Sequence, residues 1–68
     1  METIKKFRIS ENSKNYDLVE LLKDNVEYKY IVRWKWTTMR ITLSKEYDNY
    51  IDALEKYTER KKFAILCN

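Results

Sequence analysis

The segment 28–43, YKYIVRWKWTTMRITL, alternates between two kinds of side chain, and this alternation decides the expected fold. Every second residue from Tyr28 to Trp36 is apolar or aromatic, and the residues between them are basic or aliphatic. A period of two is typical of a β-strand whose faces meet different surroundings. We therefore expect a strand over 26–36, a turn at Thr37 and Thr38, and a second antiparallel strand starting at Met39.

This turn predicts a register in which apolar residues face apolar residues across the two strands. The expected pairs are Trp36 with Met39, Trp34 with Ile41, and Val32 with Leu43. The same register sets Lys35 opposite Arg40, a like-charge pair that a bound anion such as nucleic-acid phosphate would stabilise.

The apolar row is expected to be the core and the basic row to face outward. Burying the basic row would leave several charges without partners, at a cost of several kcal/mol each. The expected inward set is Phe7, Ile9, Tyr28, Tyr30, Val32, Trp34, Trp36, Ile41 and Leu43. The expected basic sheet face is Lys6, Arg8, Lys29, Arg33, Lys35 and Arg40. Trp36 stands at the hairpin end, where we expect a partly exposed aromatic that could contact a partner.

The rest of the chain divides into four expected elements: a strand over 3–9, a helix over 15–25, a helix over 44–62 and a strand over 63–67. The first helix rests on an apolar stripe of Leu18, Leu21 and Leu22, and a strand is the competing interpretation of that segment. Ser44 is the expected cap of the second helix. The resulting β-α-β-β-α-β order resembles the ferredoxin-like sandwich, an α+β fold with two helices on one face of a four-stranded antiparallel sheet.

Composition excludes several kinds of site. The 68 residues predict one small domain spanning 1–68, and they include no Gly, no Pro, no His and one Cys. Without glycine there is no phosphate-binding glycine loop, and one cysteine without histidine excludes an internal disulfide and a Cys/His zinc site. We expect no metal, no cofactor and no enzyme activity.

Charge is distributed unevenly over the expected fold. The helix over 44–62 carries an acidic stripe at Asp48, Asp52, Glu55 and Glu59, at positions i, i+4, i+7 and i+11. A basic sheet and an acidic helix would make the protein bipolar, a property that suits a protein partner or self-association. The alternative is an ordinary solvated helix face with i, i+4 compensation.

The expected setting is the cytoplasm, or the host cytoplasm for a viral protein, because the N-terminus has no apolar signal region and the single cysteine suits a reducing compartment. No membrane partner is expected.

Small size and a Lys-, Asn- and Tyr-rich composition, which indicates an AT-rich genome, favour a phage or mobile-element accessory protein that inhibits a host or defence protein by binding it. The alternative is a nucleic-acid-binding module that uses the basic face with little sequence preference. Because so short a chain buries only a small core, self-association would add buried surface, and a homo-oligomer is a further expectation.

Overall fold

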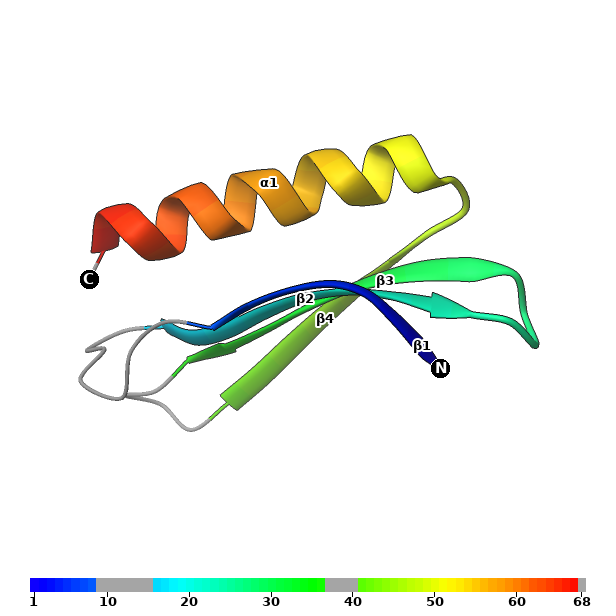
Figure 1. Ribbon diagram of the computed structural model, residues 1–68, viewed down its shortest axis with the longest axis horizontal. Helices are drawn as coiled ribbons and strands as arrows, with labels where there is room; N and C mark the ends of the chain where they lie inside the picture. The colour runs from blue at the N-terminus through cyan, green and yellow to red at the C-terminus, as the bar shows by residue number, and fades with distance from the viewer. Residues whose placement is uncertain (9–15, 37–40, 68) are drawn as a thin grey trace.

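The structure, a computed structural model, describes residues 1–8, 16–36 and 41–67, without the side chains of residues 16, 17, 36 and 67. It contains five elements: β1 (Glu2–Arg8), β2 (Tyr16–Asp24), β3 (Lys29–Trp36), β4 (Ile41–Tyr47) and α1 (Tyr50–Cys67). The strands form one antiparallel sheet in the order β1-β2-β3-β4. Figure 1 shows α1 lying along one face of this sheet, so the fold has two layers.

The α+β class and the four-stranded antiparallel sheet are confirmed, but the ferredoxin-like arrangement is wrong. The described chain has one helix, which follows all four strands, where the sequence predicted two helices interleaved with strands. Consecutive strands are neighbours in the sheet, so the sheet is a simple meander.

The expected helix over 15–25 is wrong, because this segment forms β2 at the centre of the sheet. Val19 and Leu21 are fully buried under α1, while Leu22, on the opposite face of the strand, is only 3% exposed. A central strand buried on both faces is apolar at adjacent positions and loses its alternation. Such a run can therefore reproduce the i, i+3, i+4 spacing of a helix by coincidence.

The turn between β2 and β3 is built without glycine. The Asp24 carboxylate accepts hydrogen bonds from the backbone N–H groups of Val26 (2.9 Å) and Glu27 (3.3 Å). These bonds lower the pKa of the Asp24 carboxyl, because they favour its charged form. Tyr28 then adopts a left-handed conformation with φ of 58°, where glycine would be less strained. The expected strand over 26–36 thus begins only at Lys29, and Tyr28, predicted inside, is 78% exposed.

The predicted register between β3 and β4 is wrong by two residues. Trp36 lies opposite Ile41, Trp34 opposite Leu43, and Val32 opposite Lys45. Because side chains alternate with a period of two, a shift of two changes every partner and keeps every residue on its predicted face. Lys35 accordingly lies opposite Thr42, so the expected Lys35–Arg40 pair does not form across this ladder.

The helix begins later and ends later than the sequence predicted. Ser44 is inside β4, and Asn49 caps α1 instead, since its Oδ1 accepts from the Asp52 N–H at 2.9 Å and its Nδ2 donates to the Asp52 carboxylate at 2.8 Å. The expected strand over 63–67 is wrong, because these residues continue α1. Ala64 stays fully buried at i+7 from Tyr57, which extends the inward stripe of the helix.

The core lies between α1 and the two central strands. Its members are Val19, Leu21, Val32, Trp34, Ala53, Tyr57 and Ala64, with Phe7, Tyr30, Tyr47, Tyr50 and Leu54 packed at its margin. The Arg60 guanidinium stacks 4.3 Å from the centre of the Trp34 ring.

Ile41 and Leu43, both predicted inside, remain 41% and 42% exposed because α1 contacts β2 and β3 more extensively than β4. The predictions for Ile9 and for the Trp36 side chain lie outside the described residues.

Candidate functional site

The face of the sheet opposite α1, here called the open face, is not covered by any described element (Figure 1). Strand pairing arranges its residues in rows that cross the sheet. One row is Arg8, Leu18, Lys35 and Thr42. The next row is Lys6, Glu20, Arg33 and Ser44. A third row is Thr3, Leu22, Ile31 and Glu46.

Four cations occupy the first two rows, and we call Lys6, Arg8, Arg33 and Lys35 the basic patch. Residues two apart on one strand are about 7 Å apart, and strands separated by one other strand are roughly 10 Å apart. The four backbone positions therefore form a rectangle of about these dimensions, with Leu18 and Glu20 of β2 inside it. Strand pairing places these four residues on one face, as the alternation predicted, although the sequence predicted a helix where β2 lies between them.

Glu20 and Arg33 form the central ion pair of this surface. The Nε and Nη2 groups of Arg33 both donate to Oε1 of Glu20, at 3.1 Å and 3.0 Å. The Glu20 side chain is only 8% exposed, whereas that of Arg33 is 41% exposed. The carboxylate therefore fixes one edge of the guanidinium while the other edge reaches solvent.

A groove of about 240 Å³ lies beside this ion pair, over β2, β3 and β4. The residues that line it include Leu18, Glu20, Arg33, Lys35 and Thr42. The groove therefore joins two corners of the basic patch to a hydroxyl group on the edge strand.

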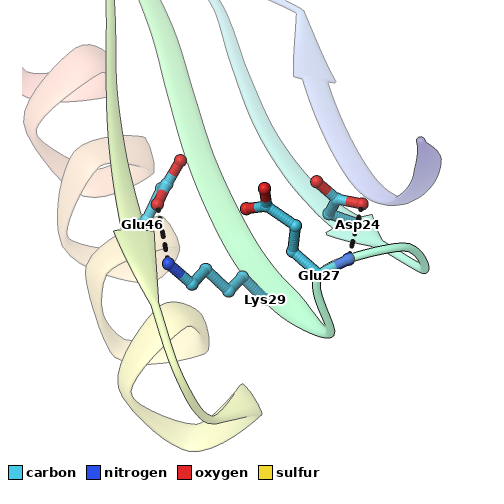
Figure 2. A network of polar contacts seen from close by, with 4 residues as sticks. All are labelled: Asp24, Glu27, Lys29 and Glu46. Carbon is cyan, nitrogen blue, oxygen red and sulfur yellow. Dashed lines mark hydrogen bonds and ion pairs between the residues drawn. The ribbon is translucent and has the colours of Figure 1, made fainter.

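The other predicted basic residues do not join the patch. Lys29 is at the far end of β3, where its ammonium group pairs with the Glu46 carboxylate at 3.5 Å (Figure 2). Asp24, the residue opposite Lys29 in β2, adds a further negative charge there. Arg40 lies outside the described residues, and so does the side chain of Trp36, so neither prediction can be placed on this face.

The acidic stripe is only partly assembled as predicted. Asp48 precedes α1, and Asp52 is engaged in the helix cap with Asn49. Asp52, Glu55 and Glu59 line a second hollow of about 240 Å³ with Tyr47 and Lys56.

Glu59 is not isolated in this hollow, because its carboxylate lies 3.5 Å from the Lys56 ammonium. Burial raises the pKa of the Tyr47 phenol, and the nearby Glu59 carboxylate raises it further. Within the described ranges no group of three or more potential ligands is arranged to hold a metal ion.

Sequence reasoning missed Glu20 and Thr42. Glu20 was assigned to the wrong element, and Thr42 was set opposite the wrong residue. One signal was available: a glutamate enclosed by Leu18, Val19, Leu21 and Leu22 needs a cationic partner if the segment is a central strand.

The two edges of the sheet differ in their protection against pairing with another strand. β1 contains a bulge between Thr3 and Lys5 and several exposed basic residues, both of which discourage pairing. β4 pairs with β3 over seven residues without a register shift and carries the half-exposed Ile41 and Leu43. β4 is therefore the more accessible edge.

No family model, curated protein or solved structure matches the chain. No helix in the described part of the chain is both long and apolar enough to cross a membrane.

Proposed function

We propose that this protein is a non-catalytic nucleic-acid-binding domain that contacts the phosphate backbone through the basic patch. The observation that carries the proposal is the position of Lys6, Arg8, Arg33 and Lys35 on two adjacent rows of the open face, which no described element covers. Cations grouped on one face release counterions from phosphates when they bind, which is the main source of non-specific affinity.

The composition of the open face favours backbone contacts over base recognition. Proteins that stack bases on a sheet use exposed aromatic rings. The described side chains that strand pairing places on the open face are charged, aliphatic or hydroxyl-bearing, and none is aromatic. We therefore expect similar affinities for nucleic acids of different sequence.

A titration of fluorescently labelled oligonucleotides of mixed sequence, followed by anisotropy, tests the proposal. We expect a dissociation constant below about 0.1 mM at physiological salt, the weak end of non-specific binding. Arg8→Glu should weaken binding, because it reverses one corner of the patch. Lys62→Glu is the matched control, since Lys62 is exposed on α1, on the other side of the sheet. Binding weaker than about 0.1 mM, or an equal effect of both variants, would refute the proposal.

A second candidate function is binding of a protein partner, and the accessible edge of β4 favours it. A partner strand could extend the sheet there, gaining main-chain hydrogen bonds and covering Ile41 and Leu43. On this proposal the chain acts in the cytoplasm, as its single cysteine predicts, as a phage or mobile-element inhibitor that blocks a host or defence protein.

Leu43→Lys tests this candidate, because lysine on an edge strand opposes strand pairing. Purified chain and a partner identified by co-purification should form a complex that Leu43→Lys weakens and Lys62→Glu does not. A complex unaffected by Leu43→Lys would refute pairing at β4. Light scattering of the unchanged chain and of Leu43→Lys tests whether the chain self-associates through this edge, since the variant should then be monomeric.

A further inference from the structure

The side chain of Arg33, one of the four cations of the basic patch, is held in place by a buried group. Glu20 accepts from Nε and Nη2 of Arg33 and is itself 8% exposed, so the guanidinium plane is fixed before any ligand arrives. A guanidinium has five N–H groups, and the bonds to Glu20 use two of them, which leaves three. Arginine presents such donors in a planar fork that matches phosphate oxygens.

The groove beside Arg33 supplies further groups that suit a phosphate. Lys35 lines it from the same strand, and Thr42 lines it from β4 with a hydroxyl that can donate a hydrogen bond. Leu18 forms an apolar part of its wall, where fewer water molecules compete for the ligand. Its volume of about 240 Å³ is below the range of about 300–1,000 Å³ that is usual for small-molecule sites, so the groove suits a group as small as a single phosphate.

We infer that this groove holds one phosphodiester group of the nucleic-acid backbone, bound by the Arg33 guanidinium, the Lys35 ammonium and the Thr42 hydroxyl. The inference rests on the proposed function and adds that the patch is not uniform. Lys6 and Arg8 attract the chain of phosphates as charges alone, whereas Arg33 binds one phosphate in a fixed geometry. Glu20 is the positioning residue that sets this geometry.

Substitution of arginine by lysine separates geometry from charge, because it keeps the charge and removes the fork. Arg33→Lys should weaken oligonucleotide binding about tenfold, since it loses a charge-assisted pair of hydrogen bonds. Arg8→Lys is the matched comparison, and we expect it to lose clearly less affinity than Arg33→Lys, because Arg8 contributes charge alone.

Removal of the hydroxyl gives a second, independent measurement. Thr42→Val should weaken binding about fivefold through loss of one hydrogen bond. Ser44→Ala is its control, because Ser44 is exposed on the same strand and face in the next row. If Arg33 and Thr42 hold the same phosphate, the double variant should lose less than the product of the two single losses.

The outcomes separate this inference from the proposed function. Absence of binding by the unchanged chain would overturn both. If the unchanged chain binds, equal affinities of Arg33→Lys and Arg8→Lys, or of Thr42→Val and Ser44→Ala, would overturn the inference alone. Thermal unfolding of each variant, followed by circular dichroism, establishes that a weakened variant is still folded.

Discussion

The proposed nucleic-acid binding predicts a salt dependence that can be calculated from the basic patch. For single strands the logarithm of affinity falls with the logarithm of salt concentration with a slope of about −0.7 for each phosphate neutralised. Four cations predict a slope of about −2.8, so a fourfold rise in salt should weaken binding about fifty-fold. If the Glu20 carboxylate cancels one of these charges, the slope is about −2.1 and the loss is about twenty-fold.

The assay is an anisotropy titration of one labelled single-stranded oligonucleotide at several sodium chloride concentrations. Arg8→Ala should reduce the magnitude of the slope by about 0.7, because one phosphate contact is lost. Lys62→Ala removes the same charge from α1 and should leave the slope unchanged. A slope shallower than about −1, or the same change in slope for both variants, would refute the basic patch as the binding surface.

Three further predictions concern stability. Tyr28→Gly should raise the free energy of unfolding, measured by urea titration, by about 0.5 kcal/mol. Glycine relieves the strain of the left-handed conformation at this exposed position, and its greater entropy loss on folding offsets part of the gain. An unchanged free energy of unfolding would contradict strain at Tyr28. Leu21→Ala should lower that free energy by about 2–5 kcal/mol, since Leu21 is fully buried, whereas Leu66→Ala, at a position 79% exposed, should change it by less than about 0.5 kcal/mol. Burial raises the pKa of the Tyr57 phenol, so the folded state holds this proton more tightly than the unfolded state, and stability should fall as the pH rises above about 10. Urea titrations between about pH 8 and 11 should show a smaller alkaline loss for Tyr57→Phe, and an equal loss would contradict the burial effect.

The candidate site was predictable in its charge but not in its geometry. The alternation around Val32 and Trp34 correctly placed Arg33 and Lys35 on the face away from the core. The same alternation placed Lys6 and Arg8 on that face, and the structure confirms it. The groove could not be predicted, because Glu20 and Thr42 enter it only through the pairing of β2 and β4 with β3.

Two features of the fold went against local sequence signals. Leu18, Leu21 and Leu22 have helical spacing, yet they belong to β2. Leu21 is buried under α1, and Leu22, on the open face, is buried between the neighbouring strands β1 and β3. Residues 63–67 are apolar enough for a strand, yet they continue α1, whose inward stripe places Ala64 against the core. In β2 tertiary burial outweighs local preference. In the last turns of α1 Ala64 is buried, whereas Phe63, Ile65 and Leu66 are exposed.

The alternation of residues in β3 is enough to predict which of its faces is inside, because leaving large aromatic side chains in water and burying unpaired charges are both costly. The sequence also determined that no glycine loop or zinc site of the Cys/His type can form, because the residues are missing. The identity of neighbouring strands and the register of their pairing, by contrast, depend on packing between distant parts of the chain and are visible only in the folded structure. A shift of two residues keeps every side chain on the same face, so the alternation in the sequence cannot reveal it. The shift nevertheless changes the cross-strand partner of Lys35 from the expected Arg40 to Thr42.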